Sequence, residues 1–433
     1  MQKKVTSAKG LRGVIRVPGD KSISHRAIIL GALAEGTTEI EGSLVSSDCL
    51  RTRRCINSLG VSIKNAKNKD RGKIYVEGHG LRGLQESDEI LNVGNSGTTM
   101  RLLCGVLAGQ PFTSFLTGDT SLCQRPMERV VVPLRKMGAQ IMGRQGGTLA
   151  PLAITGGDLK PITYKLPVAS AQVKSALLLA GLYAPGWTEV WEPAVSRNHT
   201  ELMLEAFGAQ LERENGRVRI KGLPELKAQR VSVPGDISSA AFLLVAGLIV
   251  PNSRIVINSV GLNPTRCGII DVLTAMGAKL RIFDREERAG EVQGTIEVES
   301  SSLHGISLGG EIIPRLIDEL PVLAVAALFA RGVTEIRDAG ELKVKESNRL
   351  MAICEGLTRL GGRVEELADG LRIQGGAPLR GAFCRSFGDH RIAMALAIAA
   401  LGAKGETMIN NAEIVEVSFP GFWRLLEELR CEN

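Results

Sequence analysis

The chain contains the same short phrase twice, and this duplication limits what it can fold into. The run VPGDKSIS begins at Val17, and the run VPGDISS begins at Val233. Only the first copy, together with the two residues that follow it, carries cationic or imidazole side chains, at Lys21, His25 and Arg26. A repeated scaffold in which one copy has gained cations indicates two similar halves, with an anion held between them rather than by either half alone.

The length of the chain agrees with two domains. Its 433 residues exceed one typical core and suit two domains of roughly 200 residues each. We expect the chain to divide where the phrase recurs, with hinges near Asp20/Lys21 and Val233/Gly235. Domain 1 would then comprise residues 1–20 plus 234–433, and domain 2 would comprise residues 21–233.

A module of strands and helices recurs along both halves. An apolar helix rich in Ala and Leu ends at a Gly or Pro turn before a short strand, near residues 36, 109, 185, 251, 332 and 405. Between these copies a second helix ends in glycine before another strand, at Gly60, Gly138, Gly208, Gly277 and Gly361. Glycine after the last helical turn supplies a left-handed cap. The period of about 70 residues predicts three α/β modules in each half, with a final helix over residues 422–430.

Composition and charge limit the kinds of partner that we expect the protein to bind. No apolar run is long enough to span a bilayer and no signal-type segment follows the basic start, so we expect a cytoplasmic protein without a membrane partner. The formal charge of +7 makes nucleic acid a candidate partner. Aromatic residues, however, make up only 4% of the chain and no long basic run occurs, so we expect no nucleic-acid partner. A small, highly anionic ligand explains the charge. The 8 cysteines and 5 histidines lack metal-ligand spacing, so we expect free thiols and no metal.

Polar or cationic residues recur where the apolar helices begin. GDKSISHR at 19–26, VGNSGTTMR at 93–101 and SAQVK at 170–174 each lead into such a helix. A helix N-terminus attracts anions, so Lys21 and Arg26 at such a place indicate a bound anion. Each segment alone is also typical of an ordinary cap or turn. Their recurrence in register favours a ligand site.

The second half adds a set of acidic and basic residues. Asp318 precedes one apolar helix, and Arg391 opens another. The run KVKESNR places Lys345, Glu346 and Arg349 close together. Taken singly, these three residues also fit ion pairs on a helix surface, which are common and stabilise little.

Together these motifs resemble the 5-enolpyruvylshikimate-3-phosphate synthase family along essentially the whole chain. The resemblance rests, in the family's order, on GDKSISHR, VGNSGTTMR, RPM at 125–127, SAQVK, KVKESNR and GDHR at 388–391. It implies an α/β fold of two similar domains, each built from three βαβαββ repeats of the inside-out barrel type, with a ligand cleft between them. It also implies transfer of the enolpyruvyl group of phosphoenolpyruvate to the 5-hydroxyl of shikimate 3-phosphate, in aromatic amino acid biosynthesis. The resemblance implies no cofactor, and we expect a monomer.

The resemblance further implies roles for individual residues. Shikimate 3-phosphate would be held by Lys21, Ser22, Arg26, Ser170, Ala171, Gln172, Asp318 and Lys345, with Arg197 as an added phosphate ligand. Phosphoenolpyruvate would be surrounded by Lys21, Gly97, Arg125, Gln172, Arg349 and Arg391. Asp318 would accept the hydroxyl proton with Lys345 beside it, and Glu346 together with Lys21 would supply the proton to C3.

One position departs from the family pattern. Many relatives carry a lysine two residues before the Phe-Pro near the C-terminus, where this chain has Val417. With its other motifs, the chain looks like the class II branch, whose members are often tolerant of the inhibitor glyphosate. Gly97, however, is the small residue associated with sensitivity.

Two alternatives stay open at this point. UDP-N-acetylglucosamine enolpyruvyl transferase shares the fold, but that family has Lys-Asn where Lys21-Ser22 stands and a reactive cysteine farther from its Arg-Pro than Cys123 is from Arg125. A basic protein that binds RNA or processes RNA ends is the alternative from another class, because a related fold occurs among RNA phosphate cyclases.

Overall fold

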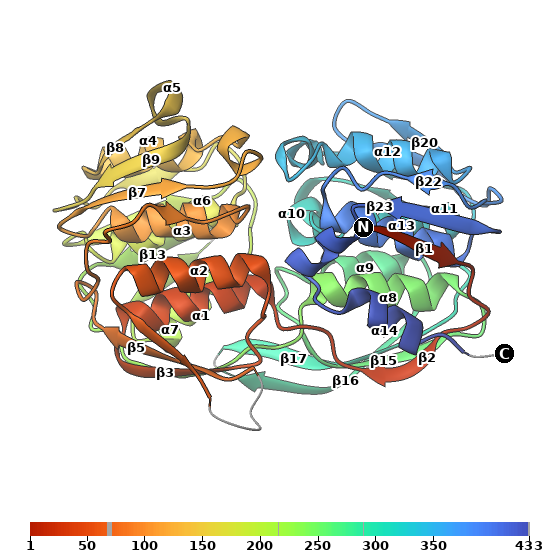
Figure 1. The fold of residues 1–433 in the computed structure, drawn as a ribbon, viewed down its shortest axis with the longest axis horizontal. Helices are drawn as coiled ribbons and strands as arrows, with labels where there is room; N and C mark the ends of the chain where they lie inside the picture. The colour runs from red at the N-terminus through yellow and green to blue at the C-terminus, as the bar shows by residue number, and fades with distance from the viewer. Residues whose placement is uncertain (67–71, 215, 289, 432–433) are drawn as a thin grey trace. The chain divides into compact units, whose positions relative to one another are not determined.

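The computed structural model describes residues 1–66, 72–214, 216–288 and 290–431. The chain divides into two compact units (Figure 1). Unit 1 comprises Met1–Pro18, Pro234–Glu287 and Val292–Asn433, and unit 2 comprises Gly19–Val233 and Arg288–Glu291.

Two short segments differ from the expected domain bounds. Gly19 and Asp20 belong to unit 2, where the carboxylate of Asp20 accepts a hydrogen bond from the backbone N–H of Ile23 at 2.9 Å and caps the following helix. Arg288–Glu291 also belong to unit 2, where the Glu291 carboxylate lies 2.6 Å from Nδ1 of His199.

The three sheets of unit 2 share one strand arrangement. In each sheet the first strand lies parallel to the second, and the remaining two strands continue in antiparallel pairs. The orders are β14(Arg230–Ser232)-β3(Glu35–Glu41)-β5(Ile74–His79)-β4(Ser62–Asn65), β6(Leu91–Asn92)-β7(Thr113–Thr117)-β9(Leu149–Thr155)-β8(Gln140–Gly143) and β10(Thr163–Lys165)-β11(Trp187–Trp191)-β13(Arg217–Lys221)-β12(Leu211–Glu214).

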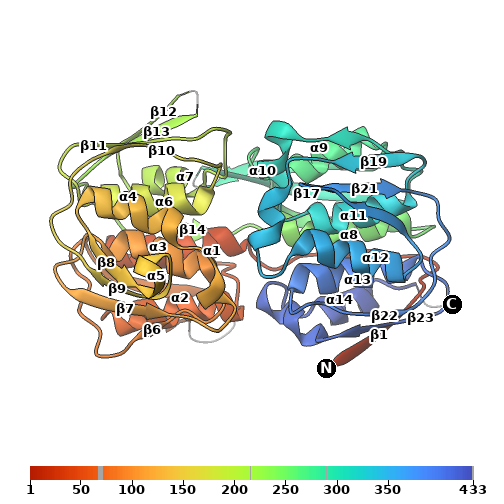
Figure 2. The ribbon, with the colours of Figure 1, turned by 90° about the horizontal axis from the view of Figure 1, so that it is seen from above.

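Unit 1 repeats this arrangement with one shortened copy. Its sheets are β16(Lys279–Arg288)-β17(Glu291–Glu299)-β15(Arg254–Gly261)-β2(Arg12–Ile15), β18(Ser307–Leu308)-β19(Val333–Ile336)-β21(Leu371–Gln374)-β20(Arg363–Glu366) and β1(Gln2–Thr6)-β23(Glu406–Asn410)-β22(Phe383–Cys384). The N-terminal arm supplies strands to two of these sheets, with β2 parallel to β15 (Figure 1) and β1 antiparallel to β23 (Figure 2). The six sheets confirm the α/β class and the expected repeats.

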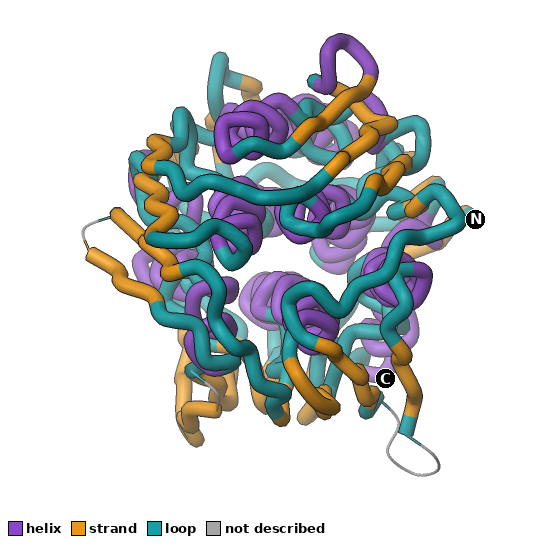
Figure 3. Tube along the Cα trace, turned by 90° about the vertical axis from the view of Figure 1, so that its left-hand side faces the viewer, coloured by secondary structure: helices purple, strands orange, loops and turns teal. Residues whose placement is uncertain are grey.

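Each repeat contributes one buried apolar helix and one amphipathic helix. A helix that is apolar on every side must be enclosed by other elements, and Figure 3 shows helices toward the middle of the fold with strands around them. The buried helices are α1(Lys21–Leu33), α3(Gly97–Leu107), α6(Ala171–Gly181), α8(Ile237–Ile249), α11(Leu320–Phe329) and α13(His390–Leu401). The amphipathic helices are α2(Ser47–Ser58), α4(Glu128–Met137), α7(His199–Ala206), α9(Gly268–Ala275), α12(Arg349–Arg359) and α14(Phe422–Glu428). The described residues also contain short helical turns at η1(Leu122–Gln124), α5(Arg144–Gly147), η2(Gly310–Ile312), α10(Ile313–Leu316), η3(Gly340–Val344) and η4(Ala412–Val417).

Glycines end five of the amphipathic helices, as the sequence predicts. All five residues have φ between +86° and +111°, a left-handed conformation that glycine adopts without a steric penalty. They are Gly60, Gly138, Gly208, Gly277 and Gly361. Within the described part of the chain, every helix is too short or too polar to cross a membrane.

Candidate active site

In unit 2, the three buried helices begin at capped N-termini. The side chains of Asp20, Ser96 and Ser170 accept hydrogen bonds from backbone N–H groups of α1, α3 and α6, at 2.9, 3.2 and 3.5 Å. Each cap satisfies one of the free N–H groups of its helix. The predicted ligand residues Lys21, Gly97 and Ala171 are therefore the first residues of capped helices.

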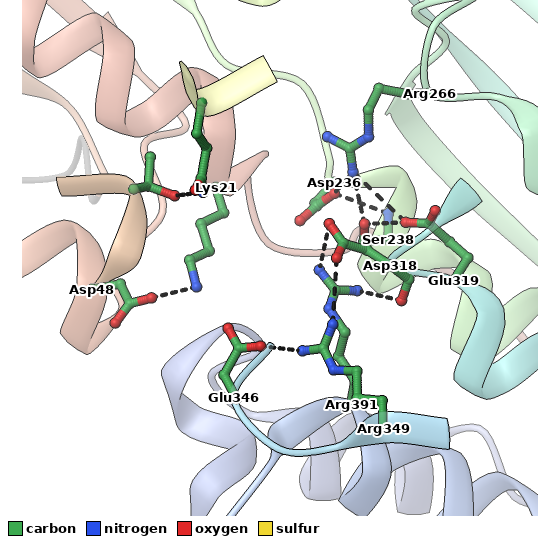
Figure 4. Close-up of polar contacts among 12 residues, drawn as sticks. Lys21, Asp48, Asp236, Ser238, Arg266, Asp318, Glu319, Glu346, Arg349 and Arg391 are labelled. Atoms are coloured by element: carbon green, nitrogen blue, oxygen red, sulfur yellow. Dashed lines mark hydrogen bonds and ion pairs between the residues drawn. The ribbon is translucent and has the colours of Figure 1, made fainter. Parts of the chain in front are cut away.

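Lys21 lies at the start of α1, beside an acidic partner from α2. Its Nζ forms an ion pair with the carboxylate of Asp48 (Figure 4). The two side chains are 18% and 8% exposed, so the pair is partly shielded from water. Asp48 was missing from the predicted site, because an acidic residue in the first turn of a helix is ordinary and gives no sign of its partner.

Arg26 is buried and is held by hydroxyl groups from two other helices. Its Nε donates to Oγ1 of Thr200 at 2.6 Å, and its Nη2 donates to Oγ of Ser175 at 2.8 Å. A third donor, Nη1, reaches the backbone oxygen of Ser22 at 2.9 Å. Burial lowers the pKa of Arg26 to about 10, although the negative charge of Glu201 opposes this effect. The guanidinium group thus stays charged at neutral pH and has a fixed orientation.

Arg197 lies close enough to Arg26 to influence it. The positive charge of Arg197 contributes to the lowered pKa of Arg26. Arg197 stands in the turn between buried Ser196 and α7, which begins at His199. Two cations near each other offer a site for a doubly charged anion such as a phosphate group.

Gln172 links the starts of α6 and α3. Its Oε1 accepts from Nη1 of Arg101 at 2.7 Å, and its Nε2 donates to Oγ1 of Thr98 at 3.0 Å. A methyl group added at Gly97 would lie 2.8 Å from the same Nη1 of Arg101 and 3.3 Å from Nη1 of Arg125. Gly97 therefore leaves room for two guanidinium groups. Arg101 was not among the predicted site residues, although it ends the motif VGNSGTTMR.

Arg125 is held against the loop that precedes α3. Its Nη2 donates to the side-chain oxygen of Asn95, and its Nη1 donates to the backbone oxygen of the same residue at 3.3 Å. Asn95 is itself held by Asp119, whose carboxylate accepts from Nδ2 at 2.7 Å. Arg125 is 8% exposed, so this chain of contacts fixes a buried cation beside Gly97.

In unit 1, Arg349 is surrounded by three carboxylates. Its guanidinium group lies 2.7 Å from Asp389, 2.6 Å from Glu346 and 3.4 Å from Asp318 (Figure 4). Burial alone would lower the pKa of Arg349, but these three negative charges outweigh it and raise the pKa. The interpretation of Glu346 and Arg349 as a surface ion pair is wrong, because the Arg349 side chain is only 1% exposed.

Asp318 faces a second arginine. Nη2 of Arg391 lies 3.6 Å from the carboxylate of Asp318, and Nη1 of Arg391 donates to its backbone oxygen at 3.0 Å. Lys345 follows η3 and is half-buried. Asp318, Lys345, Glu346, Arg349 and Arg391 all belong to unit 1, whereas the other predicted site residues belong to unit 2.

The second copy of the repeated phrase begins a buried polar cluster in unit 1. Asp236 caps α8, and Nη2 of Arg266 lies 3.2 Å from its carboxylate. The same nitrogen donates to Oγ of Ser238 at 2.7 Å, and Ser238 donates to the carboxylate of Glu319. Glu319 is fully buried beside Asp318 in the chain. The cation beside this copy of the phrase therefore comes from Arg266, which is distant in the sequence. The phrase itself contains no cation, so it did not predict this contact.

Comparisons with known proteins agree over the full chain. The family described as EPSP synthase (3-phosphoshikimate 1-carboxyvinyltransferase) matches residues 5–426. The 3-phosphoshikimate 1-carboxyvinyltransferase of Desulforamulus reducens is 56% identical over 432 residues, covering 100% of both chains. That of Pelotomaculum thermopropionicum is 55% identical over 428 residues, covering 99% of both chains.

Solved structures show the same similarity. The structure of EPSP synthase from Acinetobacter baumannii has 43% sequence identity and a TM-score of 0.88, covering 99% of this chain and 98% of that chain. The enolpyruvyl transferase NikO from Streptomyces tendae has 19% identity and a TM-score of 0.78, covering 98% of this chain and 96% of that chain. The second likeness concerns the fold alone.

Proposed function

The chain belongs to the EPSP synthase family, and on that premise we propose the roles of its site residues in transferring an enolpyruvyl group. The protein is an enolpyruvyl transferase of aromatic biosynthesis. Its substrates are proposed to be shikimate 3-phosphate and phosphoenolpyruvate. The observation that carries the assignment is 56% identity to a 3-phosphoshikimate 1-carboxyvinyltransferase over the whole of both chains.

Shikimate 3-phosphate is proposed to bind through its phosphate and its ring hydroxyls. Arg26 supplies positive charge for this anionic substrate, Arg197 supplies it for the phosphate, and the contacts of Arg26 with Ser175 and Thr200 fix the direction of its guanidinium group. Hydroxyl and amide side chains suit the polar ring. The proposed set is Lys21, Ser22, Arg26, Ser170, Ala171, Gln172, Arg197, Asp318 and Lys345.

Phosphoenolpyruvate is proposed to bind through arginines. Planar guanidinium groups match carboxylate and phosphate oxygens in pairs, and Arg125 and Arg349 are buried and held in place. Several cations also offset the repulsion between two anionic substrates. The proposed set is Lys21, Gly97, Arg125, Gln172, Arg349 and Arg391.

The proposed chemistry is an addition followed by an elimination. Asp318 takes the proton from the 5-hydroxyl, with Lys345 beside it, as the oxygen forms a bond to C2 of the enolpyruvyl group. Glu346 together with Lys21 delivers a proton to C3, which gives a tetrahedral ketal. Loss of a C3 proton and cleavage of the bond from C2 to the phosphate oxygen then release phosphate and restore the double bond.

The test is phosphate release from phosphoenolpyruvate with two different acceptors. We expect release with shikimate 3-phosphate and none with UDP-N-acetylglucosamine. Release only with the sugar nucleotide would overturn the assignment and the roles of Ser22, Ser170 and Gln172. The RNA-processing alternative is not favoured by the family match. We also propose that the protein is cytoplasmic and monomeric. Sedimentation at the mass of a single chain, 46.3 kDa, would check the monomeric state.

A further inference from the structure

A buried lysine in unit 2 joins three separate segments, although the proposed chemistry does not use it. Lys174 Nζ lies 2.7 Å from the carboxylates of both Glu192 and Glu201, and its side chain is 2% exposed. The same nitrogen lies 3.4 Å from the backbone oxygen of Ser196, whose hydroxyl donates to Glu192. Lys174 thus connects α6 to the end of β11 and to the first turn of α7.

A pair of hydroxyl groups connects the same two helices one residue away. Oγ of Ser175 lies 2.6 Å from Oγ1 of Thr200, and each of these oxygens also accepts from Arg26. Ser175 is further fixed by the backbone oxygen of Ala171 at 2.6 Å. We call Lys174, Ser175, Glu192, Ser196, Thr200 and Glu201 the α6–α7 clamp.

The α6–α7 clamp encloses the turn that carries Arg197. Ser196 is held on one side of this arginine, and Thr200 and Glu201 are held on the other. Thr200 also orients Arg26 directly. We propose that Lys174 is a positioning residue for shikimate 3-phosphate, acting through the α6–α7 clamp on Arg26 and Arg197. This inference rests on the proposed function, which makes those two arginines ligands of shikimate 3-phosphate.

Charge balance supports the same role. Burial alone would lower the pKa of Lys174, but the charges of Glu201 and Glu192 outweigh it and raise the pKa, so the lysine is charged at neutral pH. Without Lys174, two buried carboxylates would face each other without a cation between them. They would repel each other and attract Arg26, whose pKa the charge of Glu201 already raises. The attraction would draw Arg26 away from its proposed ligand, shikimate 3-phosphate.

The experiment measures binding of shikimate 3-phosphate to the full chain by calorimetry, without phosphoenolpyruvate. For Lys174→Met we expect the dissociation constant to rise by about tenfold or more, and Lys174→Arg to recover part of the loss. The matched control is Lys165→Met, which changes an exposed lysine on β10 of the same unit and leaves binding unchanged. In steady-state kinetics, KM for shikimate 3-phosphate should rise in Lys174→Met while KM for phosphoenolpyruvate stays near the wild-type value.

Unchanged affinity in a folded Lys174→Met variant would overturn the inference. If that variant does not fold, the affinity of Thr200→Val for shikimate 3-phosphate is measured instead. This substitution keeps the side-chain volume and removes only the hydroxyl that orients Arg26. Weaker binding by Thr200→Val supports the clamp, and wild-type binding overturns it. If the wild-type protein itself does not bind shikimate 3-phosphate, the proposed function fails, which is a separate outcome from equal binding by wild type and variant.

Discussion

The guanidinium group of Arg391 contacts Asp318 at two places. It donates to the backbone oxygen of Asp318 at 3.0 Å and lies 3.6 Å from the Asp318 carboxylate. The backbone contact does not depend on the charge of Asp318. A substitution that neutralises the carboxylate therefore leaves one of the two contacts in place. This makes residue 318 well suited to separating a role in proton transfer from a role in structure.

For Asp318→Asn we expect kcat to fall by about 10²–10⁴, because the amide cannot accept the hydroxyl proton. The measurement is the steady-state rate of phosphate release. Asp271→Asn is the control, since it neutralises a 54% exposed carboxylate paired with Arg315 in the same unit. Turnover within about tenfold of wild type would show that Asp318 is not the general base.

Replacing Glu346 with Gln should remove the proton donor to C3 while keeping a hydrogen bond to Arg349. We expect kcat to fall by about 10² or more. We also expect deuterium uptake at C3 to decrease when the reaction runs in D₂O. Glu355→Gln provides the comparison, because Glu355 also pairs with an arginine of α12, Arg359 at 3.0 Å, on a more exposed face. Normal deuterium uptake by the Glu346 variant would assign the proton to another group.

Gly97→Ala should weaken the binding of phosphoenolpyruvate. The added methyl group would lie 2.8 Å from Nη1 of Arg101, which must then move away from Gln172. We expect KM for phosphoenolpyruvate to rise several-fold, about 1 kcal/mol of lost binding. Gly157→Ala is the control because nothing lies within 4 Å of its new methyl group. An unchanged KM in Gly97→Ala would mean that Arg101 shifts without consequence.

Val417 allows a test of glyphosate tolerance. It is the last residue of η4 and is half-buried, where many relatives carry a lysine. We propose that the wild-type enzyme is tolerant, so half-inhibition should require glyphosate well above the concentration of phosphoenolpyruvate that the enzyme needs. Val417→Lys should lower KM for phosphoenolpyruvate by adding a cation, and Val417→Met controls for side-chain length. Wild-type inhibition at glyphosate levels comparable to the phosphoenolpyruvate requirement would refute tolerance.

His25 should make the protein less stable in mild acid. Burial, followed by the charges of Lys21 and Arg26, holds the pKa of His25 well below its ordinary value of 6.5. Below that pH the unfolded chain binds a proton at His25 that the folded chain does not. The free energy of unfolding therefore falls as pH decreases from 6.5 toward the folded-state pKa, by up to about 1.4 kcal/mol per pH unit.

The measurement is urea unfolding of wild type and His25→Asn at several pH values on either side of 6.5. Asparagine can keep a hydrogen bond to Thr52, which lies 2.6 Å from Nδ1 of His25. We expect the variant to lose less stability than wild type on acidification, whereas His79→Asn, at an exposed site, behaves like wild type. Parallel pH dependence in wild type and His25→Asn would contradict the prediction.

The fold was predictable because its signals are local and repeated. Left-handed glycines such as Gly60 and Gly361 follow from the sequence around a single helix end. Site partners were not predictable, because they are distant single residues: Asp389 pairs with Arg349 across 40 positions of the chain. The spacing of Glu346 and Arg349 is the same for a surface pair and a buried one, so only packing distinguishes the two. Nothing in the sequence indicated the contacts of Lys174, Arg266 and Glu319, although Lys174 ends the motif SAQVK, since each meets its partners only after the repeats fold.

The pairing of the N-terminal arm also sets an order of events during synthesis on the ribosome. Strands β1 and β2 leave the ribosome long before their partners β23 and β15, which begin at residues 406 and 254. All three sheets of unit 2 use strands from residues 35–232, so that unit can assemble while the rest of the chain is still being made. The backbone donors and acceptors of the arm meanwhile stay exposed, those of β2 until β15 emerges and those of β1 until β23 emerges. Nascent chains stalled after β14 but before β15 should therefore be the species most in need of a chaperone.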